Sequence, residues 1–256
     1  MNFSLIFDDH EQDFSVTCLF DEENILIVNK PAGIEVTSES GCDGFADQLK
    51  RNFFLPMLQP AHRLDRDTTG LLILAKSENS LAFLEKAFRE RKVKKYYIAL
   101  CLGVPYNKEG LINRSVSEWK RGRRPVQVIR GGGGFDAQTS YHVITSSFSV
   151  RDISNGISMI LFSPHQGRTH QIRVHSEAFG YPILGDDNYG NRAVNTILKR
   201  DFGLSRQALH AWMLDFPLPS GKVNRILCDI PSDMVRICDA CFCDWQKILS
   251  KYTQFY

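Results

Sequence analysis

Short aliphatic runs that end in turn residues constrain the fold of this chain most strongly. Two of them are NILIVNKPAG at residues 24–33 and TTGLLILAKS at residues 68–77. Each apolar run is too short for a surface helix, and the glycine or proline beside it is typical of a buried strand next to a turn. Similar runs occur at KKYYIALCLG, TSYHVITSSF, GISMILFS, ALHAWMLDFPLP and RILCDIP. The chain is therefore expected to fold mainly through strands.

Helical spacing is found in fewer segments. Apolar residues recur at helical spacing from about Asn79 to Arg91, and basic residues occupy the outer face. A second helix is expected in GRTHQIRVHSEAFG, with Thr169 as N-cap and Gly180 just past its end. A final amphipathic segment is expected from about Asp233. Because strands outnumber helices and follow one another through tight turns, the predicted class is α+β, with a mixed, largely antiparallel central sheet and flanking helices and loops.

Charge is balanced overall but clustered locally. The chain of 256 residues carries 31 Lys and Arg against 29 Asp and Glu, so affinity for a polyanion would come from clusters rather than from the total charge. KAFRERKVKK at residues 86–95 and WKRGRR at residues 119–124 are such clusters. Residues 104–135 combine turns, basic residues and GGGG, which favours a loop or hairpin over a layer of the core.

Several common chemistries lack their sequence pattern. GGGG at residues 131–134 is not followed by a Lys-Ser/Thr pair, as a phosphate loop requires. His165, His170 and His175 are spaced by five, which on a helix separates side chains by about 140° and does not suit one metal. The Cys-x-x-Cys at residues 238–241 has no second pair and fits an apolar helix face, and no Gly-x-Ser-x-Gly is present. No nucleotide, metal or other cofactor is expected.

The sequence also indicates a compartment. The N-terminal MNFSLIFDDHEQD lacks the basic and apolar regions of a secretory signal, and no apolar run approaches membrane-spanning length. The seven cysteines are odd in number and mostly lack paired spacing, which suggests reduced thiols. A cytoplasmic monomer without a membrane partner is expected.

The segment HRLDRDTTGLLILAKS, residues 62–77, places a charged turn before a buried strand. Asp65 lies between Arg63 and Arg66, whose guanidinium groups favour the ionised carboxylate, and such a carboxylate can act as a nucleophile. From spacing alone, an ordinary turn aspartate bonded to the backbone near Thr68 is at least as well supported.

This segment closely resembles the signature of the RluA family of RNA pseudouridine synthases, in which the aspartate of His-Arg-Leu-Asp is catalytic. Further blocks occur in the family's order, from about residue 20 to about residue 235: DEENILIVNKPAGIEV, KKYYIAL, GRTHQIRVH, GDDNYG and LHAWMLDFPLP. The resemblance implies the pseudouridine synthase fold and isomerisation of uridine in structured RNA. It also implies an N-terminal extension over residues 1–19, a catalytic domain over residues 20–235 and a C-terminal helical tail over residues 236–256.

The resemblance implies three catalytic residues. Asp65 would be the nucleophile, attacking the base or the ribose C1′, or assisting formation of a glycal, and these alternatives stay open. Tyr97 would lie against the uracil ring and accept the C5 proton; Ala99 fixes the register that selects Tyr97 over Tyr96. Arg173 is expected to pair with Asp65, holding the carboxylate ionised and aimed.

The same resemblance implies contacts with tRNA or ribosomal RNA. A uridine inside a stem must be flipped out before it can react, and Arg63 would fill the vacated place in the stack. His62 and Thr68 would shape the turn around the flipped nucleotide. Phosphate and base contacts are expected from the basic clusters, at Arg89, Trp119, Lys120, Arg121, Arg123 and Arg124.

The chain departs from the family pattern in two respects. No space for an S4 domain precedes the lead strand near residue 24, and Thr-Thr replaces the more frequent Thr-Ser after DRD. Without that domain the chain resembles compact members that act on tRNA or short ribosomal stem-loops. Two alternatives stay open: a carboxylate-based RNA glycosylase, which would release free uracil, and a catalytically silent RNA-binding or chaperone protein.

Overall fold

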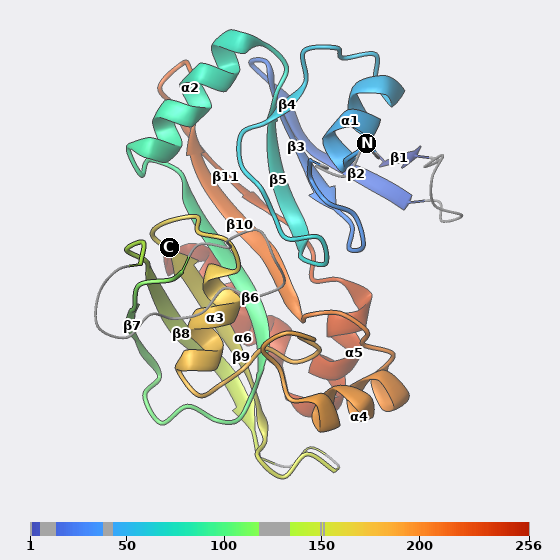
Figure 1. Cartoon of the computed structure of the whole chain (residues 1–256), viewed down its shortest axis with the longest axis vertical. Coiled ribbons are helices and arrows are strands. Elements are labelled where there is room, and N and C mark those ends of the chain that lie inside the picture. Colours follow the sequence, from blue (N-terminus) through green and yellow to red (C-terminus); the bar gives the residue numbers. More distant parts are fainter. Residues whose placement is uncertain are drawn as a thin grey trace. The chain divides into compact units, whose positions relative to one another are not determined.

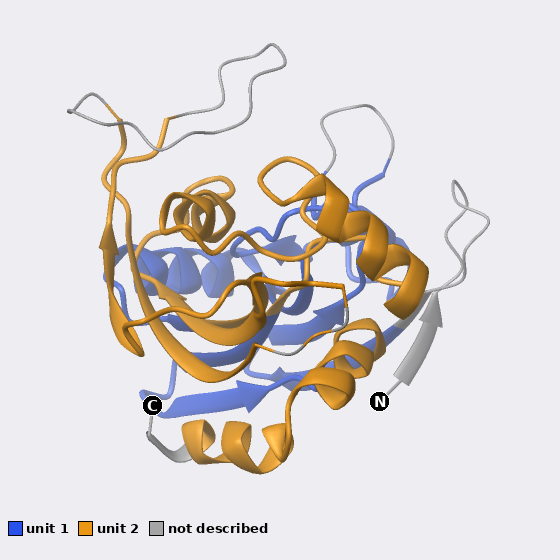
Figure 2. Cartoon of the chain, turned by 90° about the horizontal axis from the view of Figure 1, so that it is seen from below, with its two compact units in different colours: residues 1–95, 211–229 blue, residues 96–210, 230–256 orange. Residues whose placement is uncertain are grey.

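The computed structural model has an α+β architecture in which strands outnumber helices (Figure 1). It describes residues 2–5, 14–37, 43–117, 134–148, 150 and 152–255. Two compact units divide the chain: Met1–Lys95 with Ala211–Asp229, and Tyr96–His210 with Ile230–Tyr256 (Figure 2). In the part of the chain that is described, no helix is long and apolar enough to cross a lipid bilayer. The predicted α+β class is confirmed, and the predicted domain boundaries stay predictions.

Four strands of the first unit form from the predicted aliphatic runs, at residues 25–30, 69–75, 209–217 and 223–227, and the other three were not predicted. The strand bounds are β1 (Asn2–Leu5), β2 (Phe14–Glu22), β3 (Ile25–Lys30), β4 (Gln59–Pro60), β5 (Thr69–Ala75), β10 (Leu209–Pro217, mostly in this unit) and β11 (Val223–Leu227). The order is β1-β2-β3-β5-β10, with β4 paired to β5 and β11 to β10. Strands β3 and β5 are antiparallel, with Val28 opposite Leu72. Every residue of β5 is buried, so its sequence is continuously apolar rather than alternating.

Two helices belong to the first unit: α1 (Phe45–Asn52) and α2 (Glu78–Arg89). Helix α2 begins after Ser77, whose Oγ accepts the Ser80 N–H at 3.2 Å, and it packs against β5. Leu84 and Ala87 are buried while the basic residues face outward, as the spacing predicted. Helix α1 was not predicted.

The second unit contains a four-strand antiparallel arrangement in the order β6-β9-β8-β7. The bounds are β6 (Lys94–Leu102), β9 (Ile157–Pro164), β8 (Gln138–Ser147) and β7 (Glu109–Asn113). A loop or hairpin was predicted over residues 104–135, and β7 agrees with the hairpin because it pairs antiparallel with the next strand, β8. Only Ile112 of β7 is buried, so this strand has no apolar alternation to reveal it. Residues 118–133 of the predicted hairpin lie outside the described residues.

Four helices complete the second unit: α3 (Gln171–Ala178), α4 (Arg192–Phe202), α5 (Ser232–Cys241) and α6 (Trp245–Phe255). Helix α3 contacts β8 and β9, α6 contacts β8, and α4 contacts α5. The predicted single apolar helix face near the C-terminus is wrong in its continuity: Cys238 is buried on α5, Trp245 and Leu249 are buried on α6, and the buried Phe242 lies between the two helices in an extended conformation. No disulfide bond joins the cysteines of the described ranges.

The predicted N-cap of α3 is wrong by one residue. His170, not Thr169, is the N-cap, and it adopts a left-handed conformation with φ of 55°. A local turn replaces the threonine cap: the Gln171 N–H donates to the Arg168 carbonyl at 3.1 Å, and the Arg168 N–H donates to Gln171 Oε1 at 3.1 Å. At the other end, Gly180 follows the C-cap with φ of +92°, as predicted.

Candidate active site

Asp65 lies in a short connection between β4 and β5 of the first unit. The Thr68 N–H donates to the Asp65 carbonyl at 3.1 Å and closes a turn, so the predicted turn is confirmed. Leu64 is 5% exposed and anchors the connection, while Arg63 and Arg66 are exposed and Asp65 is half-buried. The closing bond uses the main-chain carbonyl of Asp65, which does not occupy its carboxylate.

Lys30, at the end of β3, ties this turn to the rest of the first unit. The side chain is fully buried, and its Nζ donates to the carbonyl oxygens of Pro31 at 2.8 Å, Arg66 at 2.9 Å and Thr68 at 3.2 Å. A second link joins Gly33 and Arg66: the Gly33 N–H donates to the Arg66 carbonyl at 3.1 Å, and Arg66 Nε donates to the Gly33 carbonyl at 2.9 Å. A buried ammonium therefore fixes the main chain on both sides of Asp67.

We expect Lys30→Met to destabilise the first unit by about 3 kcal/mol or more, because it removes charge-assisted hydrogen bonds and leaves carbonyl acceptors unsatisfied. Urea unfolding followed by circular dichroism measures the loss. The matched control is Lys76→Met, because Lys76 forms an ion pair with Asp21, which is 52% exposed. That pair should contribute less than about 1 kcal/mol. Equal losses in both variants would contradict the structural role of Lys30.

His62 connects the same turn to β5. The Ile73 N–H donates to His62 Nε2 at 3.1 Å, so this nitrogen is the acceptor and the ring is neutral. Burial and, secondarily, the nearby Lys95 ammonium lower the pKa of His62 from 6.5 to about 3. Burial also lowers the pKa of Lys95, to about 8. His62 thus holds the start of the Asp65 connection through a neutral imidazole.

This pKa predicts a loss of stability in acid. Below pH 6.5 the unfolded chain takes up a proton on His62, while the folded chain does so only near pH 3. The free energy of unfolding should therefore fall as pH drops through this window, by at most about 1.4 kcal/mol per pH unit. Unfolding curves for wild type and His62→Gln between pH 7 and pH 4.5 measure the effect; the glutamine cannot titrate, so parallel pH dependences would contradict the assignment.

Arg173, on α3 of the second unit, forms a buried ion pair with Asp186. Arg173 Nε donates to Asp186 Oδ2 at 2.7 Å and Nη2 donates to Oδ1 at 2.9 Å. The side chains are 6% and 0% exposed. Asp186 Oδ1 also accepts the main-chain N–H groups of Asn188 at 3.0 Å and Tyr189 at 3.1 Å. This arrangement fixes the guanidinium in position and orientation.

Arg173 also contacts the aromatic ring of Tyr189. The guanidinium carbon lies 5.2 Å from the centre of the Tyr189 ring, a distance suited to a cation–π contact. The Tyr189 hydroxyl bonds His170 Nδ1 at 3.0 Å. His165 and His175 bond other groups, Ser140 and Thr139 respectively.

Tyr97 lies in β6 of the second unit, opposite Phe162 of β9, and is 7% exposed. Tyr96 is 4% exposed. Because neighbours on a strand point to opposite faces, only one of these tyrosines can face a given ligand. Asp65 belongs to the first unit, and Tyr97 and Arg173 to the second, so the expected pairing of Asp65 with Arg173 stays a prediction.

The predicted RNA contacts are only partly within the described residues. Arg63 and Arg89 are exposed, His62 is partly exposed, and Thr68 is 2% exposed. The remaining predicted contacts lie outside the described residues: Trp119, Lys120, Arg121, Arg123 and Arg124. None of these contacts is tested by the fold alone.

Sequence reasoning missed Lys30 and Asp186. Both lie in segments that resemble family motifs, NKPAG and GDDNYG, but the resemblance implied no role for either residue. A lysine at the end of a strand that is apolar from Ile25 to Val28 is an unusual pattern and is a usable signal for Lys30. For Asp186 there was no such signal, because Asp187 follows it directly and spacing does not choose between them.

Comparisons with known proteins agree with the motifs. Residues 24–178 match the family described as RNA pseudouridylate synthase. Ribosomal large subunit pseudouridine synthase C of Pasteurella multocida is 34% identical over 87% of this chain and 67% of its own length. Dual-specificity RNA pseudouridine synthase RluA of Salmonella typhi is 32% identical over 84% of this chain and 92% of its own length. The predicted resemblance is confirmed.

A solved structure of a protein named as a pseudouridylate synthase has a similar fold. Human RNA Pseudouridylate Synthase Domain Containing 1 superposes with a TM-score of 0.72, covering 93% of this chain and 95% of that chain at 23% identity. At this identity the superposition supports the shared fold.

Proposed function

The chain belongs to the RNA pseudouridylate synthase family, and from this premise we propose which of its residues carry uridine isomerisation and on which RNA. In that reaction the bond between N1 and C1′ breaks, the uracil turns, and a bond between C5 and C1′ forms. C5 loses a proton and N1 gains one, so the RNA keeps its mass and no redox partner is needed. The observation that carries the assignment is the motif HRLD, whose aspartate is Asp65, on an anchored turn.

Asp65 is the proposed nucleophile, and Tyr97 and Arg173 are its proposed partners. Lys30 donates hydrogen bonds to the Arg66 and Thr68 carbonyls of the turn that carries Asp65, which supports the rigidity of this turn. The guanidinium of Arg173 is oriented by Asp186 through Nε and Nη2, a geometry that suits an arginine whose task is to aim a carboxylate. Arg63 is proposed to replace the flipped uridine in the stack.

Large-subunit ribosomal RNA is the proposed substrate class. Synthase C of Pasteurella multocida and synthase D of Nitrosomonas europaea are named for the ribosomal large subunit. A tRNA stem-loop is the second candidate, because the dual-specificity relative from Salmonella typhi matches this chain over 92% of its own length. The cytoplasmic location and the monomeric state stay predictions.

Incubation of the purified protein with RNA tests this proposal. Ribosomal RNA and tRNA are extracted separately from cells that lack the protein, and pseudouridine is mapped by carbodiimide labelling and reverse transcription. We expect new stops at one or a few uridines of the ribosomal fraction. Reverse-transcription stops in the tRNA fraction alone would identify tRNA as the substrate. Release of free uracil would indicate a glycosylase, and an absence of any change in both fractions would contradict the proposed activity.

A further inference from the structure

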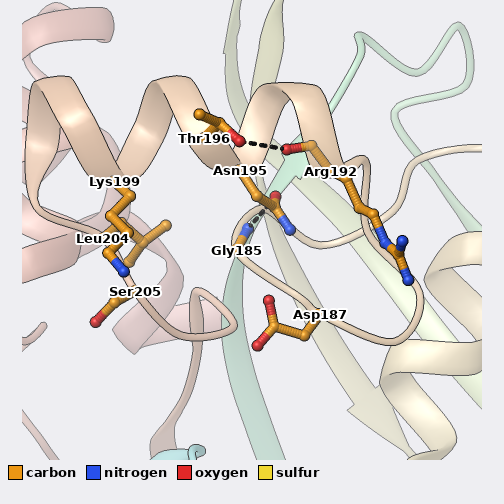
Figure 3. Close-up of a pocket in the computed structure, with 8 residues that line it drawn as sticks. All are labelled: Gly185, Asp187, Arg192, Asn195, Thr196, Lys199, Leu204 and Ser205. Atoms are coloured by element: carbon orange, nitrogen blue, oxygen red, sulfur yellow. Dashed lines mark hydrogen bonds between the residues drawn. The ribbon is translucent and has the colours of Figure 1, made fainter.

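A pocket with both polar and apolar walls lies in the second unit, against one face of α4. Its volume is about 490 Å³, within the range of pockets that hold a nucleotide-sized group. Arg192, Asn195 and Lys199 line it at helical spacing, and Asp187, Ser205 and the main chain at Gly185 form the other walls. Figure 3 shows Asp187 below the helix, with Arg192 to one side of it and Lys199 and Ser205 to the other. No motif assigned to the proposed reaction uses these cations.

The charged groups of this pocket form no ion pair with one another or with other described residues. Arg192, Lys199 and Asp187 are exposed, and none of them forms an ion pair with a described residue. Arg200 of the same helix differs, because Asp201 and Asp152 bind its guanidinium. The pocket cations are therefore available to an anion, whereas the neighbouring arginine is neutralised within the protein.

A chain of hydrogen bonds links Asn195, in the lining of the pocket, to Arg173 through Asp186. Asn195 Nδ2 donates to the Asp186 carbonyl at 3.0 Å, and Asn195 Oδ1 accepts the Gly185 N–H at 2.9 Å. Asp186 in turn holds Arg173. A Cβ at Gly185 would lie 2.0 Å from the Arg206 carbonyl oxygen, so the main chain at Gly185 packs closely against that of Arg206. The pocket thus stands directly behind the residue that orients the proposed catalytic arginine.

We propose that this pocket binds one nucleotide of the RNA backbone at a distance from the reacting uridine, a statement that rests on the proposed function. Arg192 and Lys199, separated by roughly 10 Å along the helix axis, take the phosphates on either side of that nucleotide. Asp187 accepts a hydrogen bond from its ribose 2′-hydroxyl, the group by which a protein distinguishes RNA from DNA. The charged side chains and the hydroxyl groups of the lining fit phosphate and sugar, and Leu204 adds an apolar wall.

Salt-dependent binding to a labelled RNA hairpin tests the phosphate contacts. Because such contacts carry no sequence information, a generic hairpin of about 30 nucleotides serves as the probe. In Arg192→Gln/Lys199→Gln the slope of log K against log salt should become shallower by about 1 to 2. The matched control is Lys247→Gln/Lys251→Gln, which removes the same charge from exposed positions of α6 and should keep the wild-type slope.

Three results would overturn the proposal: an unchanged slope in the α4 variant, an equal change in the α6 control, or no salt-dependent binding by wild type. The 2′-hydroxyl contact is tested with a 2′-O-methyl hairpin of the same sequence. Wild type should prefer the unmodified hairpin severalfold, and Asp187→Ala should lose that preference; an undiminished preference would remove Asp187 from the contact. Failure of pseudouridine formation, measured separately on cellular RNA, would affect the proposed function and leave the hairpin result intact.

Discussion

Asp65→Asn is expected to lower the rate of pseudouridine formation by a factor of about a thousand or more, the scale of loss seen when a nucleophile is removed. Asparagine keeps the size of the side chain, and the bond that closes the turn uses the Asp65 carbonyl, which the substitution retains. The fold should therefore persist. RNA affinity should stay within a few-fold of wild type, because the carboxylate contributes to the reaction and repels the phosphates. Single-turnover rates and hairpin binding measure the two quantities.

The matched control for this variant is Asp67→Asn, which removes the same charge two residues further along the turn. It should retain most of the wild-type turnover. If both variants lose activity equally, the effect belongs to the charge or rigidity of the turn. If Asp65→Asn remains active while folded, Asp65 is not the nucleophile.

Asp186→Asn is expected to have the second largest effect, on both stability and turnover. The change leaves the buried Arg173 guanidinium without its carboxylate, a loss of about 3 to 5 kcal/mol for a buried pair. The guanidinium should also lose its fixed orientation, so that turnover falls even where the variant is fully folded. Thermal unfolding gives the first quantity, and the rate measured well below the unfolding temperature gives the second.

A second ion pair in the same unit supplies the comparison. Arg206 Nε donates to Asp233 Oδ2 at 2.7 Å and Nη2 donates to Oδ1 at 2.8 Å, with side chains 9% and 22% exposed. Asp233→Asn should lower stability and leave the turnover of the folded enzyme near that of wild type. Equal turnover losses in the two variants, or normal turnover in Asp186→Asn, would contradict the proposed role of Asp186 in positioning Arg173.

Several strands were predictable because their buried residues are contiguous in the sequence and form short apolar runs. The run Gly70–Ala75 is buried at every position of β5, and no surface helix has such a pattern. Helix α4 was missed although Asn191 caps its start and Gly203 follows its end, because its apolar face buries only Leu198 and Phe202. Strand β7 lies at the edge of its sheet and buries one residue, which gives no periodic pattern.

The candidate site was predictable only in part, because its support comes from residues that are distant in sequence. The motif HRLD identified Asp65, but the lysine beneath the turn lies 36 residues before Arg66, whose carbonyl it binds. Arg173 came from its motif, and Asp186 lies 13 residues further on, across the end of α3. Such partners are selected by tertiary packing, and local propensity does not contain that information.

The role of Asp65 is tested most directly by a pseudouridine map of ribosomal RNA from cells that lack this protein and are complemented with wild type or with Asp65→Asn. If Asp65 is the nucleophile, wild type restores pseudouridine at a defined set of uridines, and the Asp65→Asn protein, present at equal abundance, restores none of them. Restoration of the same sites by both proteins would contradict the central claim that this carboxylate carries the isomerisation.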